Sequence, residues 1–345
     1  TEAAKAGQVK QVLAERFGEE MKFDVIIGNP PYQEETSGAG KQATPLYNLF
    51  VDEAKKLDPK YLSMIIPSRW FAGGMGLDGF REMMKKDSSI SHLVDYSNAK
   101  ECFPAISISG GVCYFLRDRD NTSICEVTNV SDGTKNIAYR SLDEFDVLVR
   151  YNKGVNIIHK VLNKKERTLA DIVSPLMPFG LSTNYRGDPK KENKDDLMLH
   201  ASDGISYIPR SVITKGIDLV DKYKVLISKT SSEHAGEPGK DGKFRVITSS
   251  VKVIGPSEVC THSYFVIGKF NTSVEAENTM SYLRTNFVRF LMLLSMSSIN
   301  LSKNVFTFVP LQDFNLNWSD KELYAKYNLT DDEIAFIESM IRPMD

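Results

Sequence analysis

The chain has 345 residues, 41% of them hydrophobic and 26% charged, a composition typical of a soluble globular protein with two domains. Its apolar runs fall well short of the roughly 20 residues that a membrane-spanning helix needs, which excludes a membrane protein. The cysteines are scattered without a C-x-x-C pair or a histidine at zinc-ligand spacing; they are Cys102, Cys113, Cys125 and Cys260. We therefore expect a cytoplasmic protein with reduced thiols and no metal site.

The net charge of −2 hides an uneven distribution along the chain. Residues 1–150 carry 18 basic and 22 acidic side chains, residues 151–310 carry 22 and 15, and residues 311–345 carry 3 and 8. A basic middle between two acidic segments is what a phosphate-facing domain would produce. An unevenly charged, solvated surface would give the same counts.

The first 150 residues alternate strand-like and helix-like runs. The chain opens at Thr1 with a polar, helix-like stretch that lacks the apolar centre of a signal peptide, so we expect it to begin at a cut within a longer protein. The alternation then predicts a parallel sheet with crossover helices, the later half of a doubly wound α/β domain. The predicted strands are residues 23–28, 61–67, 90–96 and 111–116, with helices at residues 45–57 and 77–86.

The alternation stops near residue 150, which marks the predicted end of this domain. Short β-prone pieces, such as residues 224–228 and 259–268, predict an α+β domain over residues 151–310. The glycine-rich run at 231–243 predicts an exposed loop. Helical periodicity at residues 274–294 and 331–341, the latter after a cap-like Thr330, predicts helices, and residues 311–345 form a C-terminal helical segment.

The tetrapeptide Asn29-Pro30-Pro31-Tyr32 directly follows the first predicted strand. Ligands of open α/β sheets bind beyond the carboxyl ends of the strands, where this loop falls. Two prolines stiffen the loop and leave carbonyls free to accept hydrogen bonds. The amide oxygen of Asn29 and the carbonyl of Pro30 can accept from one exocyclic amine, while Tyr32 offers a flat face for the ring that bears it.

Two convergent acceptors suit chemistry on an adenine amine, whose lone pair is delocalised into the ring. They draw the N–H bonds out of conjugation and favour a tetrahedral nitrogen that attacks an electrophilic methyl group. A base in a duplex must first be flipped out of the stack, which requires an aromatic clamp and a basic groove. The alternative is that Pro30 and Pro31 only end a strand and Tyr32 is incidental.

The run FDVIIGNPPYQ resembles the signature of amino-methyltransferases that use S-adenosylmethionine, chiefly those that modify adenine N6 in DNA. The resemblance implies a Rossmann-like catalytic sheet, catalytic roles for Asn29 to Tyr32, and cofactor contacts by Asn29, Leu46 and Phe50. PLYNLFVDEAKKL, YLSMIIPSRWF and FPAISISGGVCYFLRDRD are similar to the segments that follow in this family. An aromatic residue there packs on the flipped base, and Phe103 and Phe115 are the candidates.

The resemblance continues beyond the catalytic domain. PFGLSTNYRG at 178–187 and SINLSKNVFTFVPLQDF at 298–314 resemble the segments that bracket the target-recognition domain of type II restriction-modification methylases. This implies a site-specific DNA adenine methyltransferase with double-stranded DNA as its partner. The candidate DNA contacts in the basic segment are Arg186, Lys190, Lys191, Arg210, Lys229, Lys243, Arg245 and Lys303.

One departure from the family pattern concerns the cofactor. The glycine-rich turn that holds the methionine end of S-adenosylmethionine precedes the NPPY loop by many tens of residues in such enzymes, yet only 28 residues precede Asn29. We expect an upstream segment, with or without a fused nuclease, or a second polypeptide to supply it. Two alternatives stay open: an NPPY methyltransferase acting on RNA guanine or a protein glutamine, and a non-catalytic DNA-specificity module.

Overall fold

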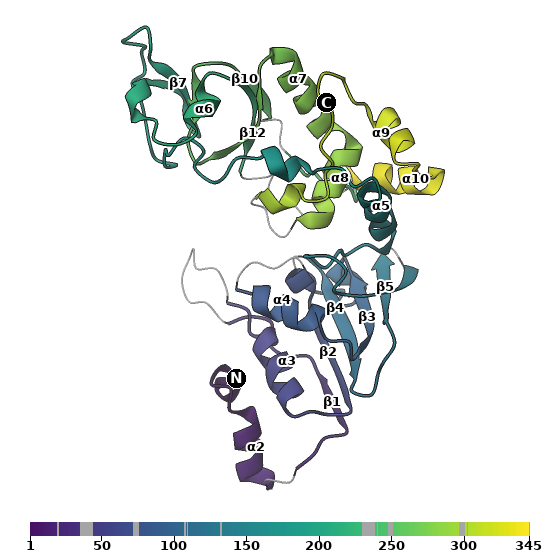
Figure 1. Ribbon diagram of the computed structural model, residues 1–345. Coiled ribbons are helices and arrows are strands. Elements are labelled where there is room, and N and C mark those ends of the chain that lie inside the picture. The colour runs from purple at the N-terminus through teal and green to yellow at the C-terminus, as the bar shows by residue number, and fades with distance from the viewer. Residues whose placement is uncertain are drawn as a thin grey trace. The chain divides into compact units, whose positions relative to one another are not determined.

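The computed structural model describes residues 1–18, 21–34, 44–71, 76–106, 108, 110–131, 133–229, 239, 241–247, 251–296, 301 and 303–344. The chain divides into two compact units, Thr1–Gly154 and Val155–Asp345, which run from purple to blue and from teal to yellow in Figure 1. Within these described ranges, no helix has the length and apolar character that crossing a bilayer requires. Most of the loop predicted at 231–243 lies outside the described residues.

The first unit is built on a six-stranded sheet with the order β1-β2-β4-β3-β5-β6. β1 and β2 are parallel, but β4 runs antiparallel to both its neighbours, so the prediction of an all-parallel sheet was wrong. The reason is local: the described residues between β3 and β4 form only the short helix η2 (Ala99–Glu101), too little for a crossover. The strands are β1 Val25–Gly28, β2 Tyr61–Pro67, β3 Ile90–Tyr96, β4 Val112–Asp118, β5 Cys125–Ser131 and β6 Thr134–Arg140.

Helices cover one face of this sheet (Figure 1). In β2, alternate residues Leu62, Met64 and Ile66 are buried, because they pack in the core formed with α3 (Tyr47–Lys56), η1 (Ser68–Phe71) and α4 (Asp78–Lys85). Before β1 the chain forms α1 (Glu2–Lys5) and α2 (Val9–Phe17), as the polar helix-like opening predicts. The prediction of an α/β sheet for this part of the chain is confirmed.

The opposite face of the sheet is apolar and exposed. Val25 and Ile27 of β1 are 50% and 78% exposed, and Tyr114, Ile137 and Tyr139 on the strands beyond are also exposed. The register places these five side chains on the same face. Among the strands that the structure describes, β1 is also an edge strand with a neighbour on one side only. The sheet therefore offers an open edge next to an apolar face.

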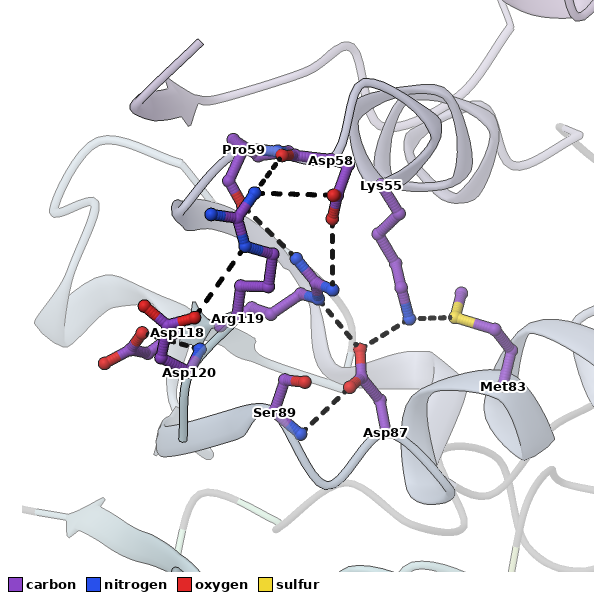
Figure 2. A network of polar contacts seen from close by, with 10 residues as sticks. Lys55, Asp58, Pro59, Met83, Asp87, Ser89, Asp118, Arg119 and Asp120 are labelled. Carbon is purple, nitrogen blue, oxygen red and sulfur yellow. Dashed lines mark hydrogen bonds and ion pairs between the residues drawn. The ribbon is translucent and has the colours of Figure 1, made fainter. Parts of the chain in front are cut away.

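A polar network ties together the loops at the amino-terminal end of β2 (Figure 2). Asp87, which precedes β3, pairs with Lys55 of α3 at 2.6 Å and accepts a hydrogen bond from the Ser89 backbone N–H at 3.0 Å. Arg119, after β4, donates to the Asp58 carbonyl at 3.2 Å. Burial alone raises the pKa of Asp87, but the hydrogen bond and charge of Lys55 lower it overall. Lys55, Asp87 and Arg119 thus have partners within the fold at this end of the sheet.

The second unit is an α+β structure with two three-stranded sheets, of order β10-β9-β12 and β11-β7-β8. Its helices include the buried α8, which Thr285 separates from α7 by capping the Val288 N–H. The prediction of one helix over 274–294 was therefore wrong, and the strand predicted at 259–268 is likewise two strands. The elements are α5 Asn152–Leu162, η3 Leu169–Ile172, β7 Leu197–Ala201, β8 Gly204–Ile208, η4 Arg210–Val212, α6 Ile217–Val220, β9 Tyr223–Ser228, β10 Lys252–Ile254, β11 Glu258–Cys260, β12 Tyr264–Phe270, α7 Ser273–Arg284, α8 Asn286–Ser295, η5 Lys303–Phe306, α9 Asp320–Lys326 and α10 Asp331–Met340.

Candidate active site

The NPPY loop lies at the sheet edge where β1, β2 and β3 end. These three strands share one direction and β4 opposes them. Pro67 at the end of β2 and Tyr96 at the end of β3 are both register partners of Val112 at the start of β4. The carboxyl ends of three strands and the entry to the fourth therefore meet at the edge where Asn29 follows β1, which is where open α/β sheets bind ligands.

Backbone hydrogen bonds hold the loop against the start of α3. The Leu46 N–H donates to the Tyr32 carbonyl at 3.1 Å, and the Glu34 N–H donates to the Thr44 carbonyl at 2.9 Å. Pro30 is buried, whereas Asn29 is exposed. The loop is thus fixed on both sides while its asparagine side chain faces solvent, as an acceptor for an incoming amine would need to do.

Three buried polar atoms near this loop have no hydrogen-bond partner among the described residues. They are the hydroxyls of Tyr32 and Tyr47 and the amide oxygen of Asn48. Burial raises the pKa of Tyr32 to about 12, with smaller contributions from the nearby Cys102 and Cys113, so its hydroxyl stays protonated at neutral pH. Buried polar groups are usually paired, and unpaired ones beside an exposed catalytic-type loop are what a ligand site leaves before the ligand binds.

A buried ion pair braces the same edge of the sheet. Arg150 donates to both carboxylate oxygens of Asp95, at 2.6 and 2.9 Å, and to the Tyr96 carbonyl at 3.2 Å. The Ser68 hydroxyl donates to Asp95 at 2.7 Å. Burial alone lowers the pKa of Arg150, but the charge of Asp95 more than offsets this and raises it. The pair therefore ties the ends of β2 and β3 to the segment before α5.

Gly111 belongs to the same brace. Its φ is +80°, and an added Cβ would lie 2.2 Å from the Tyr96 carbonyl oxygen and 2.6 Å from the Arg150 guanidinium. Only glycine fits a backbone that approaches so closely at positive φ. The entry to β4 is thereby packed directly on the end of β3.

The predicted cofactor and clamp residues lie in different surroundings. Leu46 is buried and Phe50 half-buried at the start of α3. Phe115 lies in the centre of the core at 1% exposure, whereas Phe103 is half-buried and its N–H donates to the Ala99 carbonyl at 2.7 Å. Phe103 follows Cys102, whose thiol is close enough to Tyr32 to affect its pKa. Of the two aromatics, only Phe103 is partly exposed and could be reached by a base.

The eight candidate DNA contacts are spread over the second unit and differ in their partners. Arg186 pairs with Asp203 at 2.5 Å, and Arg210 forms a two-bond ion pair with Asp221. Lys243 donates to the Glu338 carbonyl at 2.9 Å, and Lys229 contacts His262 at 3.1 Å. Within the described part of the chain no partner is found for Lys190, Lys191 or Lys303, and Arg245 is engaged in an interaction.

Sequence reasoning missed the residues that brace the site. Asp95 lies on the buried face of β3, two residues after Leu93. A carboxylate in the core register of a strand signals a buried partner, and that pattern was visible in the sequence. Arg150 and Ser68 carry no comparable signal, because their burial depends on how the chain returns to the sheet.

The part of the chain that contains this site is similar to known proteins. Residues 2–103 match the family model described as Eco57I restriction-modification methylase. Over 99 residues, 28% of this chain, an uncharacterized adenine-specific methylase of Mycoplasma pneumoniae is 44% identical. Residues 2–103 are therefore similar to the Eco57I restriction-modification methylases. The NPPY loop, α3, η1 and Asp95 all lie in this methylase segment.

More distant similarities extend further along the chain. The type II methyltransferase M.PstI of Providencia stuartii is 28% identical over 186 residues, 50% of this chain. Among solved structures, the type IIG restriction endonuclease BpuSI aligns with 92% of this chain and 54% of its own, at 10% identity and a TM-score of 0.38. The type IIL enzyme MmeI, solved in complex with DNA, aligns with 74% of this chain and 42% of its own, at 10% identity and a TM-score of 0.40. The chain spans only 24% and 36% of the lengths of the two curated relatives.

Proposed function

We propose that the protein is a site-specific DNA adenine-N6 methyltransferase of a restriction-modification system. The observation that carries this proposal is an intact Asn29-Pro30-Pro31-Tyr32 loop at the carboxyl edge of the sheet, inside the methylase segment. Backbone hydrogen bonds hold the loop to the segment that begins α3, and Asn29 is exposed. A fixed pair of acceptors beside an aromatic face suits an exocyclic amine on a planar ring, and two curated relatives are named as an adenine-specific methylase and a type II methyltransferase.

In this proposal the chain's own residues bind and orient the amine. The Asn29 amide oxygen and the Pro30 carbonyl accept its two N–H bonds, which makes the nitrogen lone pair available. Tyr32 stacks on the flipped base from one side and Phe103 covers it from the other. The acceptors gain most when positive charge develops on the nitrogen, so their contribution is to the transition state.

Methylases of this family normally use S-adenosylmethionine, which supplies the electrophilic methyl group. The residues present fit one end of it: Leu46 and Phe50 are apolar side chains, and the unpaired Asn48 oxygen at the start of the same helix is an acceptor for an amine. Among the described residues before Asn29, no glycine-rich turn follows a strand, which is the feature expected at the methionine end. We therefore propose that the residues named here contact only the other end of the cofactor.

Calorimetric titration of S-adenosylmethionine into this chain tests the assignment of the cofactor site. We expect weak or undetectable binding, because only one end of the cofactor meets the chain. Tight binding at one cofactor per chain would overturn it, and would leave the proposed reaction untouched.

The reaction itself is tested by methylation-sensitive sequencing of DNA from cells that express the intact protein or its Asn29→Ala variant. Asn163, an exposed asparagine at the end of α5, gives a matched control in Asn163→Ala. We expect N6-methyladenine at one recurring sequence with the wild type and the control, and loss of it with Asn29→Ala. Unmodified adenine throughout would move the substrate to RNA guanine or a protein glutamine.

A further inference from the structure

The segment Pro178–Gly187, which resembles a boundary of target-recognition domains, has two parts with opposite environments. Phe179 and Leu181 are at 0% and 3% exposure in the core of the second unit. The next residues, Ser182, Thr183 and Asn184, are all exposed. The segment thus anchors itself by apolar side chains and presents small polar ones to solvent.

Close backbone packing fixes the anchored part. Gly180 has a φ of +81°, and an added Cβ would lie 2.3 Å from the Thr214 hydroxyl. At the other end of the segment, a Cβ on Gly187 would lie 2.3 Å from the Tyr207 carbonyl oxygen. The His262 N–H also donates to the Leu181 carbonyl at 3.0 Å. The exposed residues are therefore held between two points where only glycine fits.

Arg186 braces the exposed part rather than extending from it. Its guanidinium donates to the Thr183 and Tyr185 carbonyls, both at 2.8 Å, and pairs with Asp203. Its charge is offset by that carboxylate. Arg186 consequently keeps the backbone of Thr183 and Asn184 in one conformation.

Two further side chains reach the same place from other elements. His262, between β11 and β12, lies with its Nδ1 3.4 Å from the Thr183 hydroxyl. Lys229, which follows β9, lies with its Nζ 3.1 Å from His262 Nε2. We call Thr183, Asn184, Lys229 and His262 the Thr183 surface; three separate parts of the chain contribute to it.

The Thr183 surface carries the positive charge of Lys229, whereas some other basic residues of the unit are paired with carboxylates. Burial and the neighbouring Lys229 lower the pKa of His262, so a neutral imidazole accepts from the Lys229 ammonium. Arg210 and Lys269, by contrast, are paired with the carboxylates of Asp221 and Asp218. Among the described residues Lys229 has no carboxylate partner. After the bond to His262, the Lys229 ammonium keeps two donors that can bind an anion.

We propose that the Thr183 surface contacts DNA, with Lys229 on a backbone phosphate and the side chains of Thr183 and Asn184 on an adjacent phosphate or base edge. The inference rests on the proposed function, because it names where the substrate of that reaction is held. Preorganised polar groups bind at a smaller cost in conformational entropy. An ammonium without a carboxylate partner in the described part of the chain, beside neutral hydroxyl and amide groups, matches the alternation of charge and hydrogen-bonding groups on a DNA strand.

The test is binding of the intact protein to a pool of short random-sequence duplexes at several salt concentrations. Lys229→Ala should weaken binding roughly 5- to 10-fold at 0.1 M salt and reduce the slope of log K against log salt by about 0.9, the loss of one phosphate contact. Lys222→Ala is the matched control, because Lys222 directly precedes β9, is half-buried like Lys229, and donates to the Asn271 amide oxygen at 2.6 Å. It should leave affinity and slope unchanged. Lys229→Arg, which retains the charge, should restore both.

Sequencing of the retained duplexes provides a second readout. Asn184→Ala and Thr183→Val carry no change in charge, so we expect the salt slope to hold while affinity or the selected bases change. Equal binding by Lys229→Ala and Lys222→Ala would overturn the Thr183 surface as a DNA contact. A wild-type protein that methylates no DNA would instead overturn the proposed function, so the two failures are distinguishable. Thermal unfolding of each variant shows that the change acts in a folded protein.

Discussion

Replacement of Arg150 by methionine should destabilise the first unit far more than loss of a surface ion pair does. The Asp95 and Arg150 side chains are 2% and 17% exposed, and three hydrogen bonds join the guanidinium to Asp95 and Tyr96. Arg150→Met leaves a buried carboxylate with the Ser68 hydroxyl as its remaining side-chain partner. Removal of one partner of a buried pair costs about 3–5 kcal/mol, whereas an exposed pair is worth about 0.2–1 kcal/mol.

Urea unfolding followed by tryptophan fluorescence measures this difference. The chain has two tryptophans, and Trp70 is fully buried in the core of the first unit. In a Trp318→Phe background, Trp70 alone reports, so unfolding of the first unit is followed separately. With a slope of about 2 kcal/mol per molar urea, a loss of ~4 kcal/mol lowers the midpoint by ~2 M.

The control is Arg119→Met, since Arg119 and its partner Asp58 are 44% and 62% exposed. It should move the midpoint by less than about 0.5 M. An apolar double replacement, Asp95→Leu with Arg150→Met, should recover most of the lost stability, because no unpaired charge remains. Equal effects of Arg150→Met and Arg119→Met would refute the argument that the pair braces the candidate site.

Three further predictions follow from burial and backbone conformation. Gly111→Ala should lower the free energy of unfolding by more than ~1–3 kcal/mol in the urea assay, because it adds a Cβ at φ +80° against the Tyr96 carbonyl. Gly79→Ala in α4, with open space around its Cβ, should be neutral or stabilising by up to ~1 kcal/mol in the same assay. Burial lowers the pKa of Lys224 to about 8, so the unfolded chain binds more protons than the folded chain between pH 8 and about 10.5. As pH rises through that window, the unfolding free energy of the wild type should increase by roughly 2–3 kcal/mol relative to that of Lys224→Met. A difference between the two that stays constant with pH would contradict this. Titration with a thiol reagent under native conditions should modify Cys102 first. The other three cysteines, Cys113, Cys125 and Cys260, are buried, and burial raises the pKa of each thiol. Faster reaction at Cys113 would show that the core opens more readily than its packing implies.

The sequence was sufficient to predict what depends on local pattern. The four strands expected in the first unit occur in the structure within two residues of their predicted bounds, since apolar alternation and flanking turns decide them. Thr330 caps α10 through a capping box, as its spacing to Glu333 indicates. The hairpin of β5 and β6 was missed, although Asp132-Gly133 between two β-prone runs is a strong hairpin signal.

What could not be predicted depends on how distant segments meet. The direction of β4 follows from the short connection after β3, and the brace of Arg150 on Asp95 joins residues 55 positions apart. Thr183, Lys229 and His262 come from three separate parts of the chain, and nothing in their sequence positions indicates that they lie together. The NPPY loop is different, because the four residues proposed to carry the chemistry are adjacent in sequence and directly follow a strand.

The most direct test of the central claim is mass spectrometry of the products formed by the intact protein with S-adenosylmethionine and mixed double-stranded DNA, RNA and protein substrates. The account predicts N6-methyladenine in the DNA as the product, formed by the wild type and lost with Asn29→Ala. Methyl groups on RNA guanine or protein glutamine, with adenine in the DNA unmodified, would contradict it.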